Sequence, residues 1–367
     1  MLVAIRLTTA KQKEIRRSIN AWIGQHLLVK EEADIGTLQG LLVFIAWEES
    51  HSSEEKRAFL ACYYFLSVNS SQFSRCNTLK SDYVATCVES LEQSGEFATD
   101  MLLTKQVKFR QVVDRIAETM PVIHESGRNN DFTSALYDEL ESIRAQLERI
   151  CDNVAYEHPK FVLLWTVQSI ALLRLYLPVT YLRPTAEEGV SQRHLQCMLY
   201  GLQAARTFFT TVASLGAIGL LYCPFPVLAD WTYAIGASSR LLLVSTDGWD
   251  LDHARRTLDL PFFLDDLIAK MTAASQLRNE KVAENTALFP SSFAQDTPED
   301  EEEEESYKKY ANKIRVIKAW YEERISAPVE DPPQPHHAGV SEPLEQTRVL
   351  NQFFMGLLGY DSWNMEF

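Results

Sequence analysis

The chain has 367 residues, and 46% of them are hydrophobic, which is enough to bury the core of one large domain or two smaller ones. The formal charge is −15, from 35 basic and 50 acidic residues, and the acidic run at residues 299–305 supplies almost half of it. This balance leaves no basic face for a phosphate backbone, which argues against direct nucleic-acid binding by these residues.

The first part of the chain is predicted to be a series of helices, because apolar side chains recur at spacings of three and four. The segment around residue 40 is apolar on nearly all sides, so we expect it to be buried. Gly95 and Pro121 are expected to end two of these helices. The predicted helices cover residues 15–27, 38–47, 59–66, 81–92 and 107–120.

Two further helices follow a clear N-terminal signal. Asp131 is a good N-cap residue and is predicted to start a helix over residues 132–150. A strongly apolar helix is then predicted over residues 160–177, ended by Pro178, and another over residues 187–214.

Residues 202–272 are predicted to form the buried helical centre of the protein. Helices there are expected to break at four residues that fit poorly inside a helix, namely Pro224, Pro226, Gly248 and Pro261. No window shows the period-two alternation of strands. The expected fold class is therefore all-α, with a single large helical domain over residues 1–285.

From residue 286 the composition shifts to Pro, Ser and Glu. We expect a flexible acidic linker over residues 286–348 that contains one charged helix at residues 307–325. Residues 349–367 are dense in apolar and aromatic side chains, and they either dock on the core as a final helix or fold on a partner as an activation segment. The activation segment is predicted to act through Phe353, Phe354, Leu357, Leu358 and Trp363.

No membrane-spanning segment is expected. The two most apolar windows, residues 161–179 and 212–235, are interrupted by charged residues or prolines, including Arg174, before they reach a spanning length.

The sequence carries no motif that is specific enough to indicate catalysis or metal binding. Residues 130–138 and the pair Asp265 and Asp266 resemble the two magnesium motifs of class I terpene synthases, but they occur in the reverse order and a further carboxylate is missing. We interpret these acidic residues, and those of residues 250–253, as helix caps and solvated faces. The cysteines have no metal-ligand spacing and are expected to be reduced and mostly buried: Cys62, Cys76, Cys87, Cys151, Cys197 and Cys223.

Three stretches, residues 38–47, 108–118 and 248–255, resemble in order and spacing the fungal-specific transcription factor domain, the middle homology region of zinc binuclear cluster regulators. The resemblance spans about residues 15–275. It implies an all-helical regulatory domain located in the nucleus, often dimeric and sometimes responsive to a metabolite. The six-cysteine DNA-binding cluster of that family is absent from this sequence, so zinc is expected only if such a cluster precedes Met1 in the native protein.

The function predicted on this basis is the control of RNA polymerase II transcription. The expected partners are the transcription machinery or co-regulator proteins, and a second copy of the chain is a further candidate partner. Two alternatives stay open: a stand-alone co-regulator that does not bind DNA, and an all-α enzyme without a recognised motif. If a metabolite is sensed, its pocket is predicted beside Trp231, Tyr233 and Trp249, where aromatic residues meet helix breaks. The same three residues also fit a plain hydrophobic core.

Overall fold

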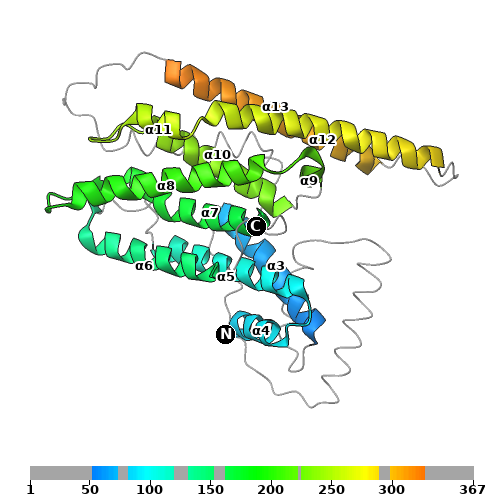
Figure 1. The fold of residues 1–367 in the computed structure, drawn as a ribbon, viewed down its shortest axis with the longest axis horizontal. Helices are drawn as coiled ribbons and strands as arrows, with labels where there is room; N and C mark the ends of the chain where they lie inside the picture. The colour runs from blue at the N-terminus through cyan, green and yellow to red at the C-terminus, as the bar shows by residue number, and fades with distance from the viewer. Residues whose placement is uncertain are drawn as a thin grey trace, which may run out of the picture.

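The computed structural model describes residues 52–72, 82–119, 131–152, 162–221, 225–288 and 298–326 (Figure 1). The helices predicted over residues 15–27 and 38–47 lie outside the described residues. So does the segment at residues 349–367, with the five side chains predicted to act in activation.

The prediction of an all-α fold is confirmed for the described residues. Apart from two short strands and one 3-10 helix, their regular elements are α-helices. These helices are α3 (Ser53–Gln72), α4 (Asp82–Ser94), α5 (Ala98–Thr119), α6 (Ser134–Ile150), α7 (Val162–Tyr176), α8 (Val190–Ala213), α9 (Ala217–Leu221), α10 (Phe225–Leu243), α11 (Leu251–Thr257), α12 (Leu260–Leu288) and α13 (Pro298–Ser326).

The helices are stacked in layers on a central pair, α7 and α8 (Figure 1). On one side, α5 and α6 share a buried apolar cluster with this pair. On the other side, α10, α12 and α13 share a second cluster with it. A third cluster joins α3, α4 and α5. Helix α7 is thus buried on two sides, which explains why its sequence is apolar almost all round.

Helix α7 also has the composition of a membrane span. The stretch Val162–Tyr181 is long and apolar enough to cross a bilayer by length and composition, with Arg174 inside it, although most of it is buried within the protein, as in a core helix. The expectation that Arg174 interrupts this stretch before it reaches a spanning length was therefore wrong.

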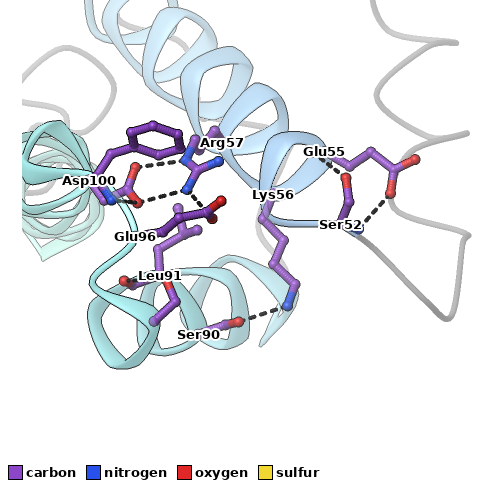
Figure 2. Close-up of polar contacts among 10 residues, drawn as sticks. Ser52, Glu55, Lys56, Arg57, Ser90, Leu91, Glu96 and Asp100 are labelled. Carbon is purple, nitrogen blue, oxygen red and sulfur yellow. Dashed lines mark hydrogen bonds and ion pairs between the residues drawn. The ribbon is translucent and has the colours of Figure 1, made fainter.

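Local sequence signals explain the ends of the first described helices. Helix α3 begins with a capping box, in which Ser52 Oγ accepts a hydrogen bond from the Glu55 backbone N–H at 3.3 Å and the Glu55 carboxylate accepts one from the Ser52 backbone N–H at 2.8 Å (Figure 2). Helix α4 ends as predicted before Gly95, which has the left-handed φ of 54° that glycine adopts at low cost.

The predicted start of α6 was wrong by a few residues. Asp131 is not the N-cap but lies in strand β1 (Asp131–Phe132), which pairs in parallel with β2 (Arg183–Pro184). Thr133 is the N-cap, because its hydroxyl accepts a hydrogen bond from the Leu136 backbone N–H at 3.2 Å. The side chains of Asp131 and Thr133 can both cap a helix. Because Asp131 is paired in a strand, the N-cap position falls to Thr133.

The predicted helix breaks in the central region fall into two groups. Gly248, with φ of 79°, separates α10 from α11 as predicted. Pro226 and Pro261 instead lie in the first turns of α10 and α12, where a missing N–H costs no helical hydrogen bond. Pro178 ends α7 as predicted, and the chain continues as the 3-10 helix η3 (Leu177–Tyr181).

The charged helix predicted at residues 307–325 is present as α13, but it begins earlier, at Pro298. The acidic run therefore falls within the first turns of this helix. Helices α12 and α13 lie side by side (Figure 1). Residue 285, where the helical domain was expected to end, lies within α12, and α13 packs against the core cluster. The division into domains stays a prediction.

The packing of α13 gives a first testable prediction. Ile317 is buried in the cluster shared with α8 and α12, whereas the neighbouring Val316 points outward and is 49% exposed. We expect Ile317→Ala to lower the free energy of unfolding by about 2–5 kcal/mol, because it leaves a cavity in the core. Val316→Ala is the matched control and should change it by less than about 0.5 kcal/mol. Urea unfolding of both variants checks this, and equal effects would show that α13 is not part of the core.

Candidate functional site

The candidate functional site is a buried charged centre where α3, α5, α7 and α10 meet. Its shortest ion pair joins Arg110 of α5 to Asp230 of α10, with 2.5 Å between Nη2 and Oδ2. The two side chains are 0% and 3% exposed, so this pair is taken fully out of water. A buried ion pair of this kind needs good geometry and further hydrogen bonds to offset the desolvation of both charges.

A second arginine approaches the same carboxylate from α7. Arg174 Nη2 lies 4.0 Å from Asp230 Oδ1, which is too far for a hydrogen bond, and its side chain is 10% exposed. Arg174 Nη1 donates a hydrogen bond to the Ser71 carbonyl at the end of α3, at 3.3 Å. One carboxylate is therefore shared unequally between two guanidinium groups.

Aromatic rings cover the flat faces of both arginines. The Arg174 guanidinium carbon lies 3.8 Å from the centre of the Tyr233 ring, and that of Arg110 lies 5.3 Å from the centre of the Tyr64 ring. Such cation–π contacts stabilise the positive charges and leave the edges of the guanidinium groups for acceptors that lie in their plane. Burial raises the pKa of Tyr233 to about 12, so this phenol stays neutral at physiological pH.

Burial and charge act differently on the two arginines. Burial lowers the pKa of Arg174, and the opposing effects of Tyr233 and Asp230 do not restore it. Burial also acts to lower the pKa of Arg110, but the nearby Asp230 and Tyr64 outweigh it, and the net change is upward. Both side chains remain protonated because arginine does not lose its proton in proteins.

A second buried carboxylate, Asp114 of α5, belongs to the same region. It accepts hydrogen bonds from the Tyr63 hydroxyl and the Ser67 hydroxyl of α3, each at 2.8 Å. These bonds hold α3 against α5.

Several donors in the centre have no hydrogen-bond partner among the described residues. They are Nε and Nη1 of Arg110 and Nε and Nη2 of Arg174, and Asp230 Oδ1 likewise lacks a donor. Leaving such groups buried and unpaired costs about 1–3 kcal/mol each, and more for charged groups. Fixed positive charges and unpaired N–H groups thus lie together in this centre, shut off from solvent.

The three residues predicted to border a pocket are not all in one place. Tyr233 covers Arg174 in the charged centre, and Trp231 is 3% exposed in the core cluster of α10. Trp249 lies beyond the other end of α10, where its indole N–H donates to the Leu241 carbonyl at 3.1 Å. The pocket itself stays a prediction.

Asp265 and Asp266, which resembled one of the two magnesium motifs, each have a lysine partner in the structure. Asp265 pairs with Lys318 of α13 at 2.7 Å, and Asp266 pairs with Lys270 of its own helix at 2.5 Å. In the part of the chain that the structure describes, no three His, Cys, Asp or Glu side chains are placed to hold a metal ion. Asp250 caps α11 as predicted, accepting from the His253 backbone N–H at 2.8 Å.

Sequence reasoning missed the charged centre. Arg110 and Asp230 are 120 residues apart, and no local pattern connects them. The available signal was a charged residue within an otherwise apolar stretch, as at Arg174 and Asp230, because such residues are rarely buried without partners.

Removing the shared carboxylate should destabilise the protein strongly. In Asp230→Asn the two guanidinium groups stay buried without their counter-charge, so we expect the free energy of unfolding to fall by about 3–5 kcal/mol. Asp265→Asn is the control, since it breaks an ion pair whose carboxylate is 59% exposed and should cost less than about 1 kcal/mol. Chemical denaturation of both variants makes the comparison, and a small loss in Asp230→Asn would contradict the role assigned to this residue.

Comparison with known proteins gives one informative similarity. No family model matches the sequence, and no solved structure matches the protein. The sequence is 22% identical to transcription factor opdL of Penicillium oxalicum over an alignment that covers 72% of this chain and 56% of that protein. The chain thus spans about half the length of the curated relative that it matches. Over most of its length, this helical protein is therefore similar to a fungal transcription factor.

Proposed function

We propose that this chain is the regulatory and interaction part of a fungal transcription regulator, which acts in the nucleus on RNA polymerase II transcription through protein partners. The observation that carries this proposal is the similarity to transcription factor opdL over 72% of the chain. The layered helical core is consistent with it, since it provides a stable scaffold with long exposed helix faces for partners. The same similarity supports a regulator without enzymatic activity.

The resemblance to the middle homology region refines this proposal. Two of the three stretches that carry the resemblance, residues 108–118 and 248–255, fall on described residues. The first lies in α5 and supplies Arg110 and Asp114 to the charged centre, and the second forms the capped start of α11. These stretches serve the packing of the helical domain, which suits a regulatory module.

A stand-alone co-regulator is the second candidate. The cysteines of this sequence do not have the arrangement of the six-cysteine DNA-binding cluster, and in this candidate DNA is reached through a partner. Such a protein would act by pairing with a second regulator, either a copy of itself or a relative that binds DNA. Co-purification with a six-cysteine relative from the native cell supports this candidate, and a DNA-binding cluster encoded in frame upstream of Met1 contradicts it.

The proposal predicts that residues 349–367 activate transcription. The chain is fused to a heterologous DNA-binding domain, and a reporter gene is measured for the intact chain and for a form that ends at residue 326. This end point keeps α13, which packs in the core, so the truncated form is expected to fold. We expect truncation to abolish activation, and we expect the same from alanine at Phe353, Phe354, Leu357, Leu358 and Trp363.

The control for this experiment is Val316→Ala in the same fusion, since this side chain is exposed and lies outside the segment tested. Circular dichroism and thermal melting verify that each variant remains folded. Undiminished activation by the folded, truncated form would show that the aromatic segment is not the activating one.

A further inference from the structure

A buried histidine lies at the junction of α8, η3 and strand β1. His194, near the start of α8, is 2% exposed. Its Nε2 lies 3.0 Å from the Val179 carbonyl oxygen of η3, and Nε2 carries the proton because a carbonyl can only accept a hydrogen bond. The ring of Phe132 in β1 meets the imidazole edge to face, with 5.1 Å between the ring centres. One side chain of α8 therefore contacts two segments that are far apart in the sequence.

The same junction carries the strand pair. Phe132 is buried, and its carbonyl accepts a hydrogen bond from the Thr185 backbone N–H, directly after β2, at 3.0 Å. The Val179 carbonyl accepts a second hydrogen bond from the Leu182 backbone N–H at 3.1 Å, where η3 leads into β2. Thr133, the N-cap of α6, directly follows Phe132. The imidazole is thus packed where η3, the strands and the first turn of α6 meet.

The neutral imidazole fits this place and the charged form does not. A neutral ring needs one acceptor for its single N–H group, and the Val179 carbonyl supplies it. An imidazolium would be buried without water beside the apolar ring of Phe132. Burial lowers the pKa of His194, and the carbonyls of Val179 and Leu182 offset this only in part.

No ionised side chain among the described residues balances a charge on this ring. Burial and two backbone carbonyls set its proton affinity. Arg193 donates instead to the Ser134 hydroxyl, and Arg240 donates to the Thr180 carbonyl at 3.3 Å. The titratable side chains on the elements around the junction, none of which acts on His194, are Asp131, Tyr137, Tyr176, Tyr181, Arg183, Arg193, Cys197, Arg240, Asp247 and Asp250.

We propose that His194 is a proton-sensitive latch, which releases η3 and strand β1 from α8 when it takes up a proton at mildly acidic pH. Release would open the strand pair and the first turn of α6, because Phe132 and Thr133 are adjacent. This inference goes beyond the proposed function and does not depend on it.

The direction of the pH effect follows from proton linkage. A histidine in the open junction regains its ordinary pKa of about 6.5, whereas the pKa in the closed junction lies lower. Between these two values the open form binds the proton and the closed form does not. Falling pH therefore favours opening in this window, and the closed junction is most stable above about pH 6.5.

The first test is an NMR titration of the full chain from about pH 8 to about pH 5.5, the range in which histidine changes charge. The Cε1–H signal of His194 is expected to titrate below about pH 6.5, because burial opposes the charge. His194→Gln assigns this signal. Exposed His253 of α11 supplies the reference signal in the same spectra.

Hydrogen exchange over the same pH range tests the opening itself. We expect the protection factor of the Thr185 amide, which donates to Phe132, to fall by up to about tenfold per pH unit below about pH 6.5. The Leu258 amide, which donates to the Ala254 carbonyl in α11, should keep its protection factor. In His194→Gln an amide N–H replaces Nε2–H and cannot take up a proton, so the protection of Thr185 should not depend on pH.

His253→Gln is the matched control, and it should keep the wild-type profile because this side chain is exposed and lies in α11. The proposal is overturned if His194 titrates at or above about pH 6.5, or if folded His194→Gln keeps the wild-type dependence on pH. Equal losses of protection at Thr185 and Leu258 would also overturn it, since they indicate global unfolding. If His194→Gln does not fold, the wild-type protein decides alone, and a constant protection factor at Thr185 contradicts the latch.

Discussion

The ion pair between Arg110 and Asp230 is the constraint on which the packing of the helices depends. It joins α5 to α10 across 120 residues of sequence, inside a region from which water is excluded. An unpaired charge in such a place is costly, so the fold must bring these two helices together and keep α7, with Arg174, beside them. Apolar packing alone tolerates small rotations of helices, whereas a buried charge pair is satisfied in few arrangements. The pair therefore restricts how α5 and α10 can rotate against each other.

The sequence predicted the elements well and their spatial relations poorly. Helical periodicity placed α5, α7 and α8 because each has an apolar stripe or is apolar throughout, and a residue such as Pro178 or Gly248 restricts the backbone locally. The first residue of α6 could not be predicted, because Asp131 and Thr133 are both good N-cap residues. In the structure Asp131 is paired with Arg183 in a strand, so Thr133 is the N-cap. The charged centre could not be predicted. Periodicity shows which face of a helix is buried, but not which helix from a distant part of the sequence packs against that face.

The C-terminal part shows how composition can mislead. A run of seven acidic residues followed by lysines has the composition of a linker, yet the backbone of residues 298–326 is helical. Within the same helix, Ala311, Ile314, Ile317 and Tyr321 recur at spacings of three and four and form its buried face. This apolar spacing indicates a packed helix, whereas the composition alone indicates a linker.

The position of α13 also has a consequence during protein synthesis. Because the ribosome makes the chain from its N-terminus, the faces of α12 and α10 that α13 covers are exposed until residues near 326 have left the exit tunnel. Chaperones bind such exposed apolar surface, and proteases remove chains that cannot bury it. A chain that stops before α13 is therefore expected to be degraded rather than to accumulate.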